Sequence, residues 1–207
     1  MSRAPGIMLA LLIIALALAS LGDAFAPKLH KHTSRLSALR ALQPVTHFEA
    51  LSVPSGRNIV VRDITKEVAE VVSRSGCQEG VVTVMSKHST VGVGVNEMEG
   101  RFVDDLRQFL LRMAPPSYPW LHNDIDNRVG PADWPGGDEA WRGFRATQPV
   151  NAHSHIVAMM IGNSEMVPIS KSVMQIGTYQ NIMVVDADGQ KGKARTILVQ
   201  ITGTKEE

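Results

Sequence analysis

The order of short β-rich runs and helical patterns restricts the fold of this chain more than any other feature of its sequence. Two amphipathic patterns, in which apolar side chains recur every three or four positions, predict helices over residues 63–76 and 100–115. About seven runs rich in Val, Ile and Thr predict strands over residues 46–53, 58–64, 80–86, 89–97, 165–170, 177–187 and 194–203. Because helices and strands do not alternate strictly, the pattern predicts an α+β fold of mainly antiparallel sheets with two or three helices.

Turn residues between these runs predict how some of them are connected. The Pro-Ser-Gly-Arg sequence at 54–57 predicts a hairpin that pairs residues 46–53 with 58–64, and the glycines of 188–192 predict a turn between the last two strands. Alternating Gly and Val at 91–95 leave one face of a strand without side chains. A ligand or another backbone segment can therefore approach that face closely.

The first 45 residues have the composition of a targeting sequence. An apolar run over residues 7–21 follows Arg3 and predicts a signal peptide over about residues 1–24. At about 15 residues the run is shorter than the roughly 20 that span a bilayer, so we expect no stable membrane anchoring after processing. Residues 25–45 contain basic residues, Ser and Thr but no acidic residue, a composition typical of a transit peptide.

These two signals in series resemble the bipartite plastid-targeting presequences of algae with secondary red plastids. The resemblance implies removal in two cuts, a mature protein that begins near residues 40 to 46, and a single domain over residues 46–207. It predicts a plastid location, and the secretory pathway is the alternative.

The charge and cysteine content exclude two classes of function. Outside residues 1–45, acidic residues outnumber basic residues by three. Such a body lacks the basic surface that binds the phosphate backbone, so we expect no nucleic-acid partner. A lone cysteine, Cys77, excludes an internal disulfide framework and a cysteine-based zinc cluster.

Histidines at the ends of predicted elements are the main candidates for chemistry. His153 and His155 are two residues apart, and in an extended segment both imidazoles would point to one side. His88 follows a predicted strand, and His122 lies in a long irregular segment, residues 117–149, that predicts a lid, a binding loop or an interface element. Three imidazoles around one cation make an open zinc-type site. We predict His88, His153 and His155 as ligands of a divalent metal, zinc or magnesium, with His122 as a fourth ligand or proton donor.

Polar residues near these histidines are candidates for further roles. Glu97 and Asp105 are candidate acid–base groups or partners that orient an imidazole. Ser89 and Thr90 can donate hydrogen bonds to a phosphate, and Arg195 can clamp one with two parallel bonds.

Asn151 precedes a short apolar run, residues 155–162, that suggests a further helix. Its side chain can cap that helix, whose N-terminus would then be a natural anion site.

These motifs, in their order along residues 46–203, resemble the YjbQ family, also called the secondary thiamine-phosphate synthase family. The positions that match its polar motifs are His88, Asn96, Glu97, Asp105, His122, Asn151, His153, His155, Gly177, Thr178 and Gln180. Asn96, Thr178 and Gln180 are therefore added to the predicted substrate-binding residues. Tyr179 replaces a tryptophan usual in the family, and Gln190 replaces a proline.

The resemblance implies a sandwich of antiparallel sheets with helices packed on one side, and a homotrimer whose sites lie between subunits. It also implies that some members replace thiamine-phosphate synthase, joining a hydroxymethylpyrimidine diphosphate to a thiazole phosphate. We therefore expect an enzyme that acts on a small phosphorylated metabolite. The alternatives are a noncatalytic trimeric module that binds such a metabolite or a metal, and a structural trimer whose histidines satisfy one another.

Overall fold

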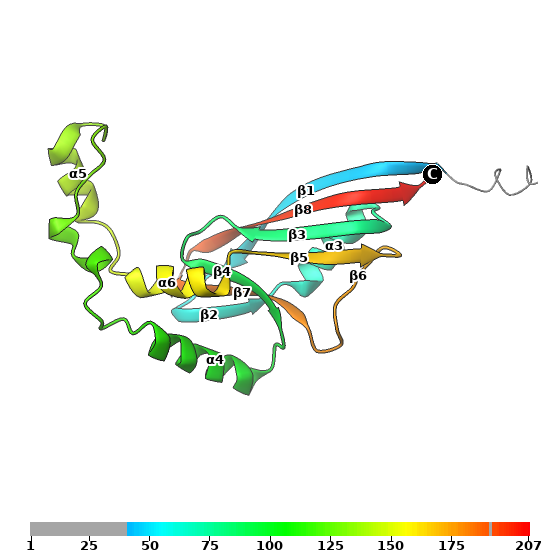
Figure 1. Cartoon of the computed structure of the whole chain (residues 1–207), viewed down its shortest axis with the longest axis horizontal. Coiled ribbons are helices and arrows are strands. Elements are labelled where there is room, and N and C mark those ends of the chain that lie inside the picture. Colours follow the sequence, from blue (N-terminus) through cyan, green and yellow to red (C-terminus); the bar gives the residue numbers. More distant parts are fainter. Residues whose placement is uncertain (1–40, 191) are drawn as a thin grey trace, which may run out of the picture. The chain divides into compact units, whose positions relative to one another are not determined.

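The computed structural model describes residues 41–190 and 192–207, which form two antiparallel sheets and four α-helices. The predicted presequence therefore lies almost wholly outside the described residues. The five-stranded sheet has the order β1 (Leu42–Pro54), β8 (Ala194–Glu206), β3 (Glu79–Ser86), β5 (Ser164–Ser170) and β6 (Val173–Met174). The three-stranded sheet has the order β2 (Asn58–Asp63), β7 (Asn181–Gly189) and β4 (Val91–Asn96). The predicted α+β class with antiparallel sheets is confirmed (Figure 1).

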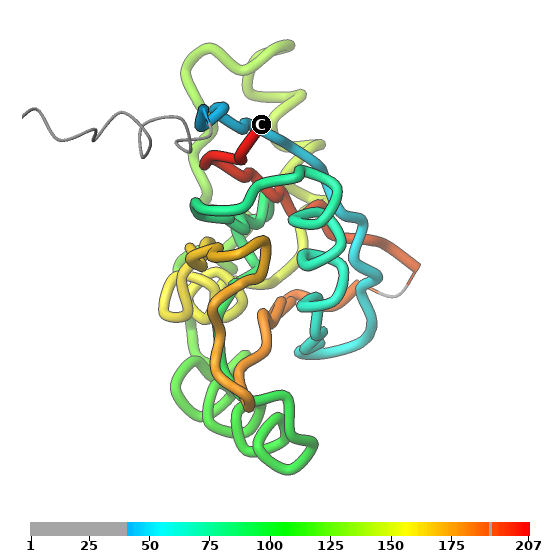
Figure 2. The backbone as a smooth tube through the Cα atoms, turned by 90° about the vertical axis from the view of Figure 1, so that its right-hand side faces the viewer, coloured from blue at the N-terminus to red at the C-terminus, as the bar shows by residue number. Residues whose placement is uncertain are grey.

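The predicted hairpin pairing is wrong, because consecutive strands belong to different sheets. β1 pairs with β8 over its full 13 residues, whereas β2 pairs with β7. In Figure 2 the blue tube of β1 continues into the cyan tubes of β2 and α3. The two connections between the sheets are tied together, since the Ser55 N–H donates to the Lys193 carbonyl at 2.9 Å. A 13-residue strand finds a full set of backbone partners in β8 and could not find one in the six residues of β2.

The main hydrophobic core lies between the sheets and includes the helix α3 (Thr65–Ser75). The helical spacing predicted for residues 63–76 is confirmed, because Val68, Val71 and Val72 are all buried in this core. Gly76, with a φ of 67°, ends the helix.

A second core covers the other face of the three-stranded sheet. Helices α4 (Gly100–Met113) and α6 (Ala152–Ile161) supply Leu110 and Val157 to it, against Val185 and other residues of the sheet. Both helices therefore lie on one side of the sandwich, as Figure 1 shows beside β2 and β7.

The glycines of β4 permit the close approach predicted for them. A Cβ atom on Gly92 would lie 2.7 Å from Ile161 Cγ2 and 3.1 Å from the Gly162 carbonyl oxygen. The segment that approaches the bare face of the strand is thus the end of α6.

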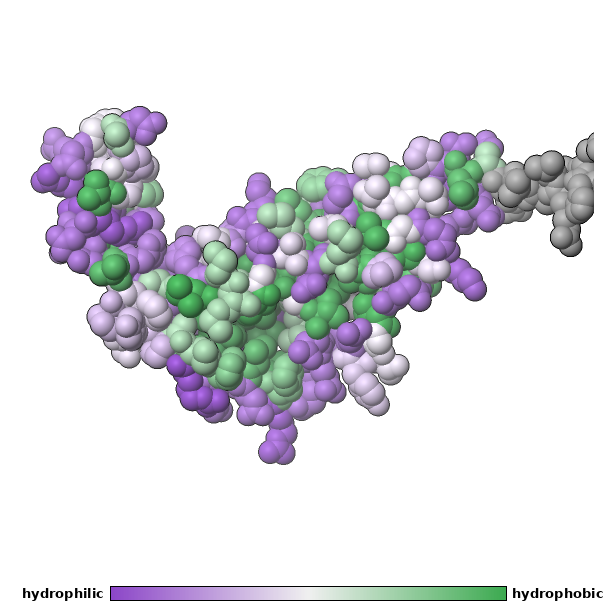
Figure 3. All heavy atoms as spheres, viewed as in Figure 1, coloured by the Kyte–Doolittle hydropathy of each residue, from purple (hydrophilic) through white to green (hydrophobic). Residues whose placement is uncertain are grey.

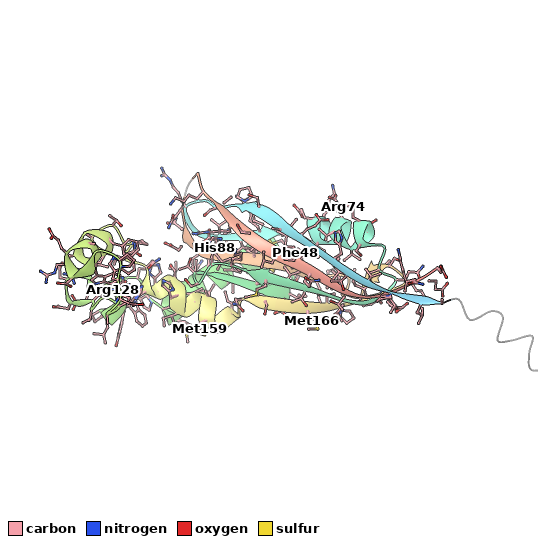
Figure 4. All side chains as sticks on the ribbon, turned by 90° about the horizontal axis from the view of Figure 1, so that it is seen from above. Phe48, Arg74, His88, Arg128, Met159 and Met166 are labelled. Atoms are coloured by element: carbon pink, nitrogen blue, oxygen red, sulfur yellow. The ribbon has the colours of Figure 1, made fainter. Side chains whose placement is uncertain are left out.

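Two surfaces of the sandwich carry exposed apolar side chains. Phe48 and Met166, on the outer face of the five-stranded sheet, are 56% and 63% exposed (Figure 4). Apolar residues also gather over α6 and α4 in Figure 3, where Met159 and Met160 are exposed. Among the described residues, none of the helices has both the length and the apolar character required to cross a membrane.

The segment between α4 and α6 is more structured than the sequence predicted. It contains the 3₁₀ turns η1 (Leu121–Asn123) and η2 (Ile125–Asn127) and a nine-residue helix, α5 (Gly137–Arg145). The sequence analysis missed α5 because its few apolar residues, Ala140, Trp141 and Phe144, follow the Gly and Pro residues that mark the segment as irregular. The first strand also begins earlier than predicted, since β1 starts at Leu42, four residues before residue 46.

Candidate functional site

A cavity of about 410 Å³ lies at the end of the three-stranded sheet where β4 begins and β7 ends. Three of the predicted histidines line it, each from a different part of the chain: His88, His122 and His155. We call this cavity the histidine pocket. The predicted hydroxyl residues Ser89 and Thr90 line it too.

His88 is held at the end of β3 by backbone hydrogen bonds. Its Nε2 accepts a hydrogen bond from the Thr196 N–H at 3.0 Å, so the neutral ring carries its proton on Nδ1. The His88 N–H donates to Ser86 Oγ at 3.1 Å. Burial, and then the positive charge of Arg195, lowers the pKa of His88. The imidazole is therefore neutral near pH 7.

His122 and His155 meet edge to face in the pocket. Their ring centroids are 4.9 Å apart with an interplanar angle of 70°. His122 keeps an exposed edge, yet partial loss of solvent lowers its pKa, as do the charges of Arg128 and His155. A pair of neighbouring imidazoles of this kind can pass a proton to or from a bound ligand.

His153 does not line the pocket, because residues 152–161 are helical. Positions two apart on a helix differ by about 200° in direction, so the prediction of an extended segment with both imidazoles on one side is wrong. The Nδ1 atom of His153 is buried and has no hydrogen-bond partner among the described residues. Burial is the main cause that lowers the pKa of His153.

The predicted metal ligands are not assembled within one chain. Among residues 41–190 and 192–207, no group of three or more His, Cys, Asp or Glu side chains is arranged to hold a metal ion. The angle of about 200° between the directions of His153 and His155 on α6 explains this, and His88 Nε2 already accepts a hydrogen bond from a backbone N–H. The residues present therefore do not fit the zinc or magnesium site predicted from His88, His153 and His155.

Asn151 occupies the cap position of α6, but its side chain makes a different bond from the one predicted. Its Nδ2 donates to Asp188 Oδ2 at 3.0 Å, and it makes no cap hydrogen bond. Asn123 performs the capping instead, because its Oδ1 accepts from the Ala152 N–H at 2.9 Å. This bond ties the turn that carries His122 to the first turn of α6.

Arg195 is a structural residue and does not clamp a phosphate in this arrangement. It is buried, and its Nε and Nη2 donate to the two carboxylate oxygens of Asp186 at 2.7 and 3.0 Å. Its Nη2 also donates to the Asp188 carbonyl at 2.5 Å. The ion pair holds the end of β7, from which Asp188 reaches the pocket. The prediction of a phosphate-clamping Arg195 is therefore wrong for the single chain.

The remaining predicted site residues lie away from the pocket. Asn96, Glu97, Thr178 and Gln180 are exposed at the opposite end of the three-stranded sheet, which we call the far end, and Asp105 is exposed on α4. Six residues of β4, at about 3.3 Å per residue, place roughly 20 Å between the two ends. Within one chain these residues do not join His88.

Four polar residues of the pocket were missed by the sequence reasoning: Lys87, Arg128, Gln148 and Asp188. Lys87 adjoins His88, and Asp188 belongs to the predicted turn, so their positions gave a partial signal. Arg128 and Gln148 come from the long segment predicted as a lid or binding loop, in which no spacing distinguishes one basic or polar residue from another.

Comparisons with known proteins agree with this architecture. Residues 49–204 match the family model described as UPF0047 protein YjbQ-like. A UPF0047 protein of Methanothermobacter thermautotrophicus is 30% identical over 155 residues, which cover 75% of this chain and 91% of that protein.

Solved structures show the same fold. A YbjQ-like protein of Sulfolobus solfataricus P2 superimposes with a TM-score of 0.65 at 28% identity, covering 78% of this chain and 99% of that one. A hypothetical protein from Aeropyrum pernix K1 gives a TM-score of 0.61 at 29% identity, covering 75% and 98%. The chain therefore belongs to the YjbQ-like UPF0047 family.

Proposed function

We propose that this protein binds a small phosphorylated metabolite in the histidine pocket and catalyses a reaction on it. The observation that carries the proposal is the convergence of three imidazoles and two cationic side chains, those of Lys87 and Arg128, on one cavity of about 410 Å³. The five side chains come from the β3–β4 connection, the segment between α4 and α6, and helix α6, so only the folded chain brings them together. A cavity of this size suits a small metabolite.

The charges and donors of the pocket favour an anionic guest. Lys87 and Arg128 supply positive charge, and the hydroxyls of Ser89 and Thr90 can donate hydrogen bonds to phosphate oxygens. The carboxylate of Asp188 also lines the pocket, but its Oδ2 accepts hydrogen bonds from Asn151 and Gln190, both at 3.0 Å. These two hydrogen bonds partly offset the negative charge of Asp188, so it repels an anionic ligand less.

The proposed chemistry uses imidazoles and fixed cations. Where the attacking group carries a proton, a neutral His122 can accept it and return it to the departing group. In a thiamine-phosphate synthase-like reaction, the carbon–oxygen bond to the diphosphate breaks, the diphosphate leaves with the electron pair, and the thiazole nitrogen bonds to the carbon. Lys87 and Arg128 would neutralise the charge on the departing diphosphate.

A noncatalytic binding module is the second candidate, and one observation favours it. The carboxylates predicted as acid–base groups, Glu97 and Asp105, do not line the pocket of the same chain. The pocket then has binding groups but lacks the predicted carboxylate base.

Calorimetric titration with inorganic pyrophosphate tests the proposal. We expect the wild type to bind, and H155Q to bind at least about tenfold more weakly, because a hydrogen bond to a charged group contributes about 1.5–3 kcal/mol. H47Q is the matched control, since His47 lies on β1 and bonds to Glu49 at 2.8 Å. A wild type that binds neither pyrophosphate nor phosphate would refute the proposal.

An activity assay then separates the two candidates. The wild type is supplied with the pyrimidine diphosphate and the thiazole phosphate, and thiamine phosphate is measured by chromatography. Product that disappears in H155Q supports the enzyme. Tight pyrophosphate binding without product, over these and other phosphorylated substrates, selects the noncatalytic module.

We also propose that the protein is a homotrimer and that its presequence directs it to a plastid. The exposed apolar side chains of Phe48, Met166 and Met159 support self-association, because such side chains gather at interfaces between subunits (Figure 4). Native mass spectrometry that finds only monomers would contradict the trimer. An N-terminal sequence of the native protein that begins at Met1 would contradict removal of the presequence.

A further inference from the structure

Residues 128–148 form a small unit with a core of its own. The rings of Trp134, Trp141 and Phe144 pack together, with centroids 4.9 to 5.8 Å apart. Trp141 is only 7% exposed. A Cβ on Gly130 would lie 2.6 Å from Trp141 Cγ, so the chain passes directly against that ring. We call residues 128–148 the α5 unit.

The α5 unit fixes the backbone of Arg128. The Arg128 carbonyl accepts hydrogen bonds from Trp141 Nε1 and from Arg145 Nη1, each at 3.0 Å. Both lone pairs of that oxygen are thereby used. On the other side, the Arg128 N–H donates to the Ile125 carbonyl of η2. Arg128 is therefore held by helix α5 behind it and by the 3₁₀ turn before it.

The side chain of Arg128 is left for the pocket. Among the described residues, no carboxylate forms an ion pair with its guanidinium, whereas Arg142 of the same unit pairs with Asp138 and Arg145 donates to the Arg128 carbonyl. Arg128 lines the histidine pocket beside His122 and Lys87. Figure 4 labels it on the segment that leads to α6. A guanidinium on a fixed backbone and without an acidic partner is available to an anionic ligand.

We propose that Arg128 is the residue that selects a diphosphate over a single phosphate, and that the α5 unit serves to hold it over the pocket. The inference rests on the proposed function, since it assigns a role in binding the same phosphorylated ligand. A guanidinium binds two phosphate oxygens in one plane, whereas a lysine acts as a point charge. A fixed backbone leaves less side-chain freedom to be lost on binding.

Calorimetry with inorganic pyrophosphate and orthophosphate tests this role in the full-length protein. We expect R128Q to weaken pyrophosphate binding at least about tenfold and orthophosphate binding by a smaller factor, because the fork of donors is lost. R128K should recover part of the affinity, through charge alone. R142Q is the matched control, since Arg142 is in the same unit but pairs with Asp138. It should change affinity less than about twofold.

The variant W141F tests the positioning role of the unit. It keeps an aromatic ring in the cluster but removes the N–H that donates to the Arg128 carbonyl. We expect W141F to lose more pyrophosphate affinity than R142Q and less than R128Q. Thermal unfolding confirms that each variant is folded. W141F with wild-type affinity would overturn the positioning role.

The outcomes separate this inference from the function on which it rests. If H155Q loses pyrophosphate binding while R128Q binds as the wild type does, the role of Arg128 is refuted and the histidine pocket remains the binding site. If R128Q weakens both anions equally, the selectivity for diphosphate is refuted. If the wild type binds neither anion, both proposals fall.

Discussion

The two ends of the three-stranded sheet are built from the same strands, yet the histidine pocket lies at one end and exposed polar residues lie at the other. At the histidine pocket, α6 and the segment before it cover the strand ends, and Asn151 and Asn123 form side-chain hydrogen bonds with residues from distant parts of the chain. At the far end the bonds of the predicted site residues are local. Asn96 Oδ1 accepts from the N–H of the next residue, and Gln180 Oε1 from that of Gly177. Polar residues at a strand end thus become a candidate site only where a further layer encloses them.

The buried ion pair behind the pocket should give the largest difference between the two ends. We expect R195M to lower the free energy of unfolding by about 3–5 kcal/mol, because it leaves the carboxylate of Asp186 buried without its cation. Q180A, at the exposed far end, should cost about 0.5–1.5 kcal/mol for one lost hydrogen bond. Chemical denaturation measures both. Equal losses of unfolding free energy would mean that other groups stabilise the Asp186 carboxylate in R195M, and that side chains at the two ends contribute equally to stability.

The glycines of β4 offer a comparison along a single strand. G92A should destabilise the protein by about 1–3 kcal/mol, since the new methyl group would overlap Ile161 of α6 and the overpacked core must shift. G94A, two residues nearer the far end, would place its methyl 3.9 Å from Ile161 Cγ2, an ordinary contact. Its cost should be smaller. Similar unfolding midpoints for the two variants would show that α6 moves aside at no cost.

Histidines near the pocket end of the three-stranded sheet should also make the stability of the protein depend on pH. Burial lowers the pKa values of His88 and His153 in the folded protein. Histidines in the unfolded chain have a pKa of about 6.5, so below that pH the unfolded chain binds more protons than the folded protein does. The stability that these neutral imidazoles contribute is therefore fully present above pH 6.5, and it is lost as the pH falls from there through their lowered pKa values in the folded protein.

Denaturation midpoints at pH 7.5 and pH 5.0 test this dependence. H153L should show a smaller drop between the two conditions than the wild type, because one depressed imidazole is gone. It also removes the buried Nδ1 atom that lacks a partner among the described residues. An equal drop in both proteins would assign the pH dependence to other groups.

The local elements of this fold could be predicted from the sequence, but the pairing of its strands could not. The 3.6-residue spacing of Val68, Val71 and Val72 and the breaks at Gly76 and Pro115 depend on neighbouring residues alone, and α3 and α4 appeared where expected. Pairing depends on contacts across the whole chain. The connections at 55–57 and 190–193 change sheets, although their composition is typical of hairpin turns.

The candidate site was predictable in the same limited way. His88, His122 and His155 share a pocket, as their positions at element ends suggested. The assignment of His153 failed because the helix suggested over residues 155–162 begins earlier, at Ala152. His153 and His155 therefore both lie on it and point in directions about 200° apart. Arg128 was missed because its position depends on the packing of the tryptophan cluster of the α5 unit, and the sequence alone does not show which residues that cluster places at the pocket.

The smallest effect is expected from the far end itself. E97Q should change pyrophosphate affinity less than about twofold, because Glu97 is exposed and roughly 20 Å from the histidine pocket of its own chain. A large loss of affinity or activity in E97Q would break the comparison, since it would mean that the far end of one copy completes the pocket of another. Mixing E97Q with H155Q chains distinguishes the cases. If the site is shared between copies, some interfaces in the mixture combine an intact Glu97 with an intact His155, and part of the pyrophosphate binding returns. If the site lies within one chain, the mixture binds no more pyrophosphate than its E97Q chains bind alone.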